Sequence, residues 1–232
     1  MIKLLAFDID NTLAEINKPI LSETRQQLIA FEKKGVKIAF VSGKPSIYIS
    51  GMVRQVGLES PIIIGENGLS IYYGCSVPPS HVINCAYSNK DRELLLSVKA
   101  MIMEHFGEDV WFQPNEVSVT AFPKNIEMSE LREVVLAIFE DEKILETLVY
   151  YQHSDSIDIA PKQVNKGNAI QQLLDYEGWT SEHIIGIGDG ENDIPLFEKS
   201  GRSIGVDFQG DYKVDTNVPS IAEAMDLLNN IV

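Results

Sequence analysis

The chain opens with MIKLLAFDIDNTL, residues 1–13, in which an apolar run over residues 2–7 stops abruptly at Asp8. A second run of this kind, VKIAFV, covers residues 36–41 and stops at Ser42. Apolar runs of this length predict strands that are buried on both faces of a parallel sheet. The segment between them, residues 22–35, has the apolar spacing of a helix. The N-terminal part therefore predicts a β-α-β unit.

The same alternation continues along the chain and returns near the C-terminus. The pattern predicts a helix over 46–56 and a strand over 61–64, and later a helix over 166–176. Further strands are predicted over 184–187 and 203–206, with helices after residue 192 and from residue 220. Such alternation predicts an α/β fold built on a doubly wound, mostly parallel sheet.

The middle of the chain follows a different order. Residues 89–160 read as helix, two strands, helix and two strands, an αββαββ order typical of an α+β layer. We therefore predict an inserted smaller domain at 84–158 and a core made of 1–83 and 159–232. Prolines at Pro78-Pro79-Ser80 and Ala160-Pro161-Lys162 are typical of the connections between two such domains.

Composition and charge exclude several classes of protein. The 232 residues are 44% hydrophobic and 23% charged, which is typical of globular proteins. Nineteen Lys plus Arg against 34 Asp plus Glu give a net charge of −15, which disfavours nucleic acid and anionic membranes as partners. The N-terminal apolar run is too short for a signal peptide, and two cysteines, Cys75 and Cys85, are most simply reduced thiols. We expect a cytoplasmic monomer or homodimer.

Acidic residues directly follow the first predicted strand. Asp8 and Asp10 project to the same side of an extended chain, at the carboxyl edge where open α/β sheets bind ligands. Two neighbouring carboxylates repel each other, so a divalent cation is their natural partner.

Three further motifs follow or precede predicted elements at this same edge. Ser42-Gly43 offers a hydroxyl and an unhindered backbone N–H to a phosphate. Lys166 stands at the start of a predicted helix, where its charge suits an anion. The segment 188–193, GDGEND, adds carboxylates and glycines. Together they predict a metal held by acids beside a phosphate held by Ser42, Gly43 and Lys166.

This ordered set of four motifs resembles that of the haloacid dehalogenase-like superfamily. The chain looks most like its Cof-type class, with a type IIB cap inserted between the second and third motifs, and is similar to archaeal-type phosphoglycolate phosphatases and sucrose-phosphate phosphatase relatives. Glu66-Asn67-Gly68 also matches a GENG stretch common in this class. The resemblance implies a Rossmann-like core and assigns substrate specificity to the cap.

The resemblance also implies roles for individual residues. Asp8 would be the nucleophile that forms an aspartyl-phosphate, and Asp10 the general acid and base. Ser42 and Lys166 would stabilise the transferring phosphoryl group. Mg²⁺ would be held by Asp8, the Asp10 backbone carbonyl and Asp189, with Asp193 and Asn192 nearby. Asn67 and Lys44 are further candidates, and Lys44 stands where many relatives carry Arg.

The predicted function is Mg²⁺-dependent hydrolysis of a small phosphate ester, either a sugar phosphate or phosphoglycolate. The second Asp of the first motif points to a phosphatase or a phosphomutase, so a phosphohexomutase is the first alternative. A binding protein that senses a phosphorylated metabolite without turnover is the second. The candidate cap cations for a second anionic group of the substrate are Lys90, Lys99, Lys124 and Arg132.

Overall fold

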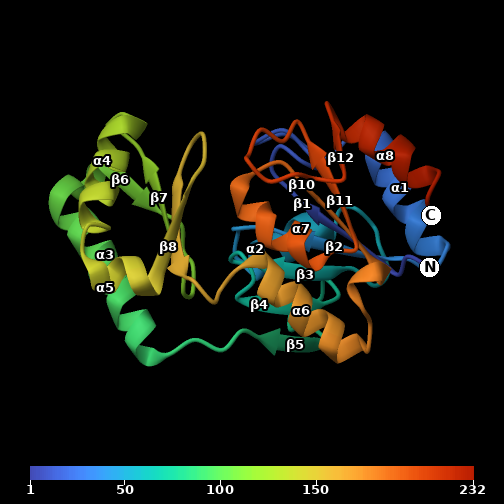
Figure 1. The fold of residues 1–232 in the computed structure, drawn as a ribbon, viewed down its shortest axis with the longest axis horizontal. Helices are drawn as coiled ribbons and strands as arrows, with labels where there is room; N and C mark the ends of the chain where they lie inside the picture. The colour runs from blue at the N-terminus through green and yellow to red at the C-terminus, as the bar shows by residue number, and fades with distance from the viewer. The chain divides into compact units, whose positions relative to one another are not determined.

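The computed structural model describes residues 1–232 and divides into two compact units (Figure 1). The core unit comprises Met1–Cys85 and Asn165–Val232, and the cap unit comprises Ala86–Val164. The sequence placed these divisions at 83/84 and 158/159. The second of those positions falls inside strand β9 (Ile157–Pro161), which pairs with two other cap strands and so belongs to the cap unit.

The core unit is built on one eight-stranded sheet with the order β12-β11-β10-β1-β2-β3-β4-β5. Neighbouring strands from β12 to β3 are parallel, and β4 and β5 add an antiparallel edge. The strands are β1 (Leu4–Asp8), β2 (Lys37–Val41), β3 (Ile62–Gly65), β4 (Ser70–Tyr73), β5 (His81–Asn84), β10 (Ile184–Gly188), β11 (Arg202–Val206) and β12 (Thr216–Val218).

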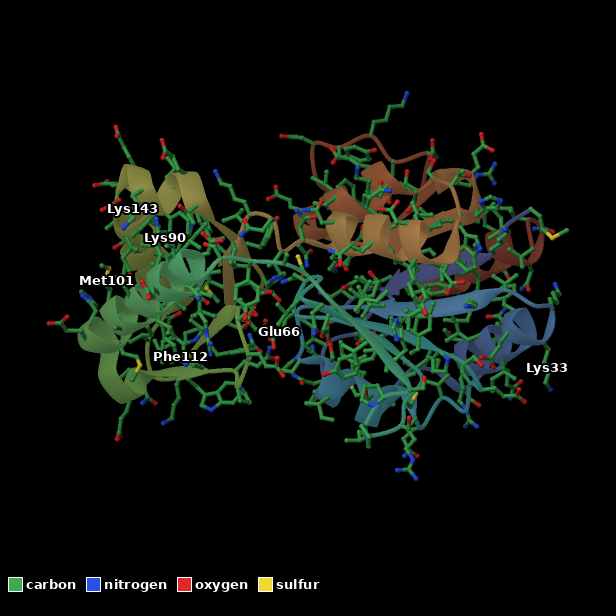
Figure 2. All side chains as sticks on the ribbon, turned by 90° about the horizontal axis from the view of Figure 1, so that it is seen from below. Lys33, Glu66, Lys90, Met101, Phe112 and Lys143 are labelled. Atoms are coloured by element: carbon green, nitrogen blue, oxygen red, sulfur yellow. The ribbon has the colours of Figure 1, made fainter.

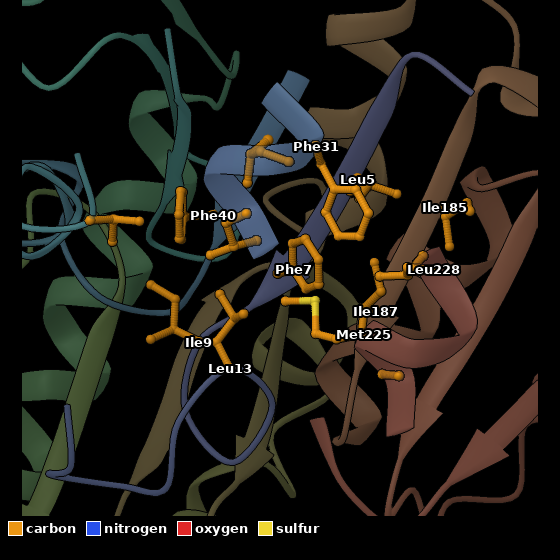
Figure 3. Packing of buried hydrophobic residues seen from close by; sticks show 14 of the residues in the cluster. Leu5, Phe7, Ile9, Leu13, Phe31, Phe40, Ile185, Ile187, Met225 and Leu228 are labelled. Carbon is orange, nitrogen blue, oxygen red and sulfur yellow. The ribbon is translucent and has the colours of Figure 1, made fainter. Parts of the chain in front are cut away.

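Helices cover both faces of this sheet, because the central strands are apolar on both sides. Alternate residues such as Leu5 and Phe7 pack with α1, α2 and α8 on one face, where Phe31 and Met225 also lie (Figure 3). The other face packs against α6 and α7. The core helices are α1 (Ser22–Lys33), α2 (Ser46–Val53), α6 (Lys166–Glu177), α7 (Ile194–Lys199) and α8 (Ile221–Asn229). The predicted doubly wound α/β core is confirmed.

The order of the strands decides where a ligand can bind. From β1 the chain proceeds to β2 and β3 on one side, and from β10 to β11 and β12 on the other. The direction of winding therefore reverses between β1 and β10, and open α/β sheets bind ligands at this point, beyond the carboxyl ends of the strands. Asp8 and Asp189 stand at the ends of these two strands.

The cap unit is an antiparallel sheet with helices on one face, as Figure 1 shows. Its strands have the order β6-β7-β9-β8, and its helices and strands follow each other in the predicted αββαββ order with one short extra helix. The bounds are α3 (Asn89–Phe106), β6 (Val110–Phe112), β7 (Val119–Pro123), α4 (Met128–Ile138), α5 (Glu142–Thr147), β8 (Leu148–Gln152) and β9.

Four elements of the structure were not predicted from the sequence. Strands β4, β5 and β12 are short, and β5 is largely exposed at the sheet edge, so no apolar run marks them. The second helix of the predicted αββαββ order is divided in two, because α4 ends at Ile138 and α5 begins at Glu142. Asp141 separates the two, because its carboxylate accepts hydrogen bonds from Lys143 N and Ile144 N and caps α5. None of the helices combines the length and apolarity needed to cross a lipid bilayer.

Candidate active site

Asp8 is held at the end of β1 by the strands on either side. In the sheet register Asp8 lies opposite Val41 of β2, the residue before Ser42, and Phe7 lies opposite Ile187 of β10. Strands β1, β2 and β10 therefore end side by side, and the polar residues that follow them begin at the same edge of the sheet. The Asp8 side chain is 9% exposed, so a carboxylate stands in an almost dry environment.

Lys166 connects Asp8 to the loop after β10. It is the first residue of α6, its side chain is fully buried, and its Nζ donates to Asp8 Oδ1 and to Asp193 Oδ1 at 2.6 Å each. An ammonium group has three N–H donors, so one remains for an anion. Burial lowers the pKa of Lys166, but the charges of Asp193 and Asp8 outweigh that effect and raise the pKa above its usual value. The lysine is therefore charged.

Asp193 organises the loop that carries Asp189. Its Oδ2 accepts hydrogen bonds from the backbone N–H groups of Asp189 and Gly190 at 3.0 Å, while its Oδ1 is bound to Lys166. Although it directly precedes α7, its side chain makes no capping hydrogen bond to that helix. The close packing needs a glycine at 188, because any Cβ there would overlap the Asp193 carboxylate.

Thr12 is a site residue that the sequence analysis quoted in its motif but did not assign. Its side chain is buried, and its Oγ1 donates to Asp189 Oδ1 at 2.7 Å. A hydroxyl in the turn after β1 thereby orients a carboxylate that follows β10. Its position four residues after Asp8 was the available signal.

The carboxylates of Asp8, Asp189 and Asp193 form one group, in which one oxygen from each lies within 4.8 Å of the others. Burial raises the pKa of Asp8 well above its usual value; Lys166 lowers it, and Asp193 and Asp189 raise it further. Burial and the charge of Asp193 also raise the pKa of Asp189, although the Thr12 hydrogen bond lowers it. One ammonium faces three acids, so the group has room for more positive charge.

This group suits a divalent cation. Mg²⁺ prefers carboxylate oxygens and retains several waters, so one or two protein carboxylates suffice. Asp8 and Asp189 fit that requirement, because Asp8 contacts Lys166 through Oδ1 alone, Asp189 contacts Thr12 through Oδ1 alone, and the two carboxylates lie in one group. Asp193 fits less well as a direct ligand, since both of its oxygens already accept bonds from Lys166 and the loop backbone.

Asp10, two residues after Asp8, forms an ion pair with Lys44. The Asp10 carboxylate is not part of the acidic group but contacts the Lys44 ammonium through Oδ2, and both side chains are about a third exposed. Backbone hydrogen bonds from Asn11 N to Ala14 O and from Leu13 N to Ile9 O fold this segment into a tight turn. Asp10 is therefore more accessible than Asp8.

The loop that follows β2 is held by the turn after β3. Ser42 is buried and its Oγ accepts from Lys44 N at 3.2 Å, which curls the chain around Gly43. The N–H of Asn67 donates to Ser42 O, and the Asn192 side chain donates to Asn67 Oδ1 at 3.4 Å. The predicted metal and phosphate residues thus lie in the core unit, on loops beyond the carboxyl ends of the parallel strands or, for Lys166, at the start of α6, whereas the candidate cap cations belong to the other unit.

A family model for haloacid dehalogenase-like hydrolases matches residues 5–91 and 103–209, which is most of the chain. The chain belongs to the haloacid dehalogenase-like hydrolase family. The predicted family is confirmed, and with it the prediction that the chain is an enzyme of the hydrolase class. The matched segments include all four motifs of the core unit.

Curated relatives of this hydrolase have phosphatase names. A phosphoglycolate phosphatase from Methanoculleus marisnigri is 24% identical over 210 residues, covering 89% of this chain and 84% of the relative. A 5-amino-6-(5-phospho-D-ribitylamino)uracil phosphatase from Bacillus subtilis is 24% identical over 241 residues, covering 94% of this chain and 91% of the relative.

Solved structures show the same fold. A haloacid dehalogenase-like hydrolase from Bacteroides thetaiotaomicron has a TM-score of 0.77 at 17% identity, covering all of both chains. The HAD subclass IIB sugar phosphatase BT4131 has a TM-score of 0.70 at 20% identity, covering 99% of this chain and 98% of that one. The likeness extends over the core unit and the cap unit of this hydrolase.

The acidic group predicts how the stability of the metal-free hydrolase depends on pH. Because folding raises the pKa values of Asp8 and Asp189 above the usual 3.8, the folded protein retains protons that the unfolded chain has released. Stability therefore falls as pH rises from about 4 through the raised values. Urea unfolding in EDTA should give a lower midpoint at pH 8 than at pH 5.5, and Mg²⁺ should restore most of the difference. If the urea midpoint of the metal-free protein instead rose between pH 5.5 and pH 8, folding would not raise the pKa values of these carboxyl groups.

Proposed function

We propose that this hydrolase is a Mg²⁺-dependent phosphomonoesterase that acts on a small phosphorylated metabolite through an aspartyl-phosphate. The observation that carries the proposal is the buried Asp8 carboxylate, held by Lys166 and facing Asp189. A nucleophile needs a fixed, ionised oxygen. The Lys166 ammonium orients Asp8 and, together with a bound Mg²⁺, would oppose the burial that raises the pKa of this carboxyl. The names of the curated relatives support the same class of reaction.

In the proposed reaction the Asp8 carboxylate attacks phosphorus and the bond from phosphorus to the alcohol oxygen breaks. Asp10, which is accessible next to Asp8, gives a proton to the leaving alcohol. The aspartyl-phosphate is then attacked by a water from which Asp10 takes the proton back, and this releases phosphate and restores both carboxyl groups. The Ser42 hydroxyl, the Gly43 N–H and the third N–H of Lys166 would hold the phosphoryl oxygens.

Mg²⁺, when bound, would neutralise negative charge on the nucleophile and on the phosphoryl oxygens. Asp8, Asp189 and the backbone carbonyl of Asp10 are the proposed ligands. The fixed turn at 9–14 and the Thr12–Asp189 hydrogen bond would hold these groups ready. For Asp193 we propose an indirect role, in which it shapes the loop and orients Lys166, and Asn192 remains a candidate partner of a metal-bound water.

We propose that the cap unit selects the organic part of the substrate. In its sheet Thr120 lies opposite Asp158, which lies opposite Tyr151. The neighbouring residue Tyr150 contacts Phe139 at the end of α4, so the helices cover the other face. Side chains alternate along strands, and Thr120 and Asp158 therefore lie on the face without helices.

The chemistry of that face favours hydroxyl groups over a second anion. Asn115 Nδ2 donates to Thr120 Oγ1 at 2.9 Å, and His153 Nε2 lies 3.4 Å from Asp158 Oδ2. None of the four cap strands contains Lys or Arg. Of the candidate cations, Lys90, Lys99 and Arg132 stand on helices, as Figure 2 shows for Lys90, and Lys124 donates to the Glu108 carbonyl. We therefore place sugar phosphates ahead of phosphoglycolate.

A panel of phosphate esters, assayed with Mg²⁺ and with EDTA, tests this function. We expect Mg²⁺-dependent release of inorganic phosphate, with higher kcat/KM for hexose and pentose phosphates than for phosphoglycolate. Interconversion of hexose 1- and 6-phosphates without release would instead show a phosphohexomutase. Tight binding of one ester with no turnover would show a sensing protein. With this function we also propose that the protein is cytoplasmic and that it is a monomer or a homodimer.

A further inference from the structure

The turn after β3 has an unusual backbone that the proposed reaction does not use. Three consecutive residues, Glu66, Asn67 and Gly68, have positive φ values of 48°, 54° and 113°. Non-glycine residues rarely adopt this conformation, and it persists only where the surroundings enforce it. Glu66 and Asn67 are also polar residues that are 3% and 1% exposed. Tight hairpin turns often contain left-handed residues, but joining two strands does not require the polar side chains of Glu66 and Asn67 to be buried.

The first contact of this turn is with the loop that holds Ser42 and Lys44. The N–H of Glu66 donates to Lys44 O and the N–H of Asn67 donates to Ser42 O, both at 2.9 Å. These two bonds lie beyond the ends of β2 and β3 and do not continue the register of the two strands, so they belong to the turn itself. The loop is thereby fixed at both sides of Gly43.

The second contact is with the first turn of α6. A Cβ at position 68 would overlap the carbonyl oxygen of Asn165, so the Gly68 backbone lies directly against that residue. Asn165 caps α6 through its side chain, which accepts from Asn168 N, and Lys166 follows it. The third contact is the hydrogen bond from Asn192 to the Asn67 side chain. One turn therefore touches three of the loops that carry the site.

We propose that the turn Glu66–Gly68 is a positioning element that sets the distance between the Ser42 loop and Lys166. The proposal rests on the proposed function, in which these two groups hold the same phosphoryl group. The backbone N–H of Asn67 fixes the loop that carries Ser42. Because Gly68 has no side chain, Asn165 and the following Lys166 can lie close to the turn. Asn67 and Gly68 are positioning residues and touch no reacting atom.

Two alanine variants, one before β4 and one directly after it, isolate the contact with Asn165. Gly68→Ala and Gly74→Ala both place alanine at positive φ, but a Cβ at Gly74 meets nothing within 4 Å. Both substitutions therefore strain the backbone, at φ values of 113° and 82°, but only the Cβ of Gly68→Ala would displace Asn165 and Lys166. With p-nitrophenyl phosphate as substrate, we expect Gly68→Ala to lower kcat and raise the Ki of inorganic phosphate about 10- to 100-fold. Gly74→Ala should stay within about twofold of wild type.

A second pair separates the backbone of Asn67 from its side chain. Asn67→Gly and Asn67→Ala both lose the carboxamide, but glycine adopts the left-handed conformation freely and alanine does not. We expect phosphate to bind Asn67→Gly about tenfold more tightly than Asn67→Ala. Urea unfolding of all four variants shows which of them are folded, and this pair decides the question if Gly68→Ala does not fold.

The outcomes separate the positioning element from the function it serves. An active wild type in which Gly68→Ala matches Gly74→Ala, or Asn67→Gly matches Asn67→Ala, would overturn the positioning element alone. A wild type that neither hydrolyses phosphate esters nor binds inorganic phosphate would overturn the proposed function. Loss of phosphate binding that only parallels a loss of stability in all four variants would also reject the positioning role.

Discussion

Replacing Asp8 by Asn should reduce phosphate release on the order of 10³-fold or more, because the amide oxygen is a poor nucleophile and no aspartyl-phosphate can form. The change is nearly isosteric, so the fold of the strand end is retained. Steady-state release of phosphate from the best ester measures the loss of turnover. A search for acid-stable phosphate on the protein shows whether the aspartyl-phosphate forms. If the Asp8→Asn variant kept its Mg²⁺-dependent activity, Asp8 could not be the nucleophile and the proposed mechanism would be wrong.

The same substitution should stabilise the metal-free protein. Asp8 is buried beside two other carboxylates that raise its pKa, so its ionised form costs free energy at neutral pH. A neutral amide removes that repulsion, although it also weakens the contact with Lys166. We expect a higher Tm in EDTA than wild type and a smaller gain on addition of Mg²⁺. Asp175→Asn, an exposed change on α6, is the matched control and should alter neither activity nor Tm.

The strand ends could be predicted from sequence because two independent signals coincide there. Apolar runs such as those before Asp8 and Asp189 define strands, and the abrupt change to acidic residues marks the edge of the sheet. Parallel pairing then places the carboxyl ends of these strands at the same edge of the sheet, irrespective of the structure of the segments that connect them. The doubly wound core and the inserted α+β unit follow from local patterns of this kind.

Contacts between side chains could not be predicted in the same way. The sequence does not show that Asp193 uses both oxygens on Lys166 and its own loop, or that Asp10 pairs with Lys44. Such pairings depend on side-chain directions fixed by tertiary packing. Strand β9 shows the same limit for domain boundaries, because its membership in the cap unit is decided by pairing with β7 and β8.

Replacing Lys166 by Met should affect both activity and stability strongly. The side chain is fully buried between two carboxylates at 2.6 Å, so its removal leaves Asp8 and Asp193 without their counter-charge. Breaking a buried pair by removing one partner costs about 3–5 kcal/mol. Loss of a positive group that faces the phosphoryl oxygens should also lower kcat about 10²- to 10³-fold. Urea unfolding in EDTA and phosphate release measure the two effects separately.

Two control variants test whether the burial of Lys166 causes the expected loss of stability. Lys44→Met removes the lysine of the other ion pair, which is about a third exposed, and should cost less than about 1 kcal/mol of stability. Combining Lys166→Met with Asp193→Asn removes one of the two orphaned charges, so stability should partly return while activity stays low. That split would show that Asp193 acts through the charge balance and the position of Lys166. Equal destabilisation by Lys44→Met and Lys166→Met would instead mean that the dry environment around Asp8 does not control the energetics of this site.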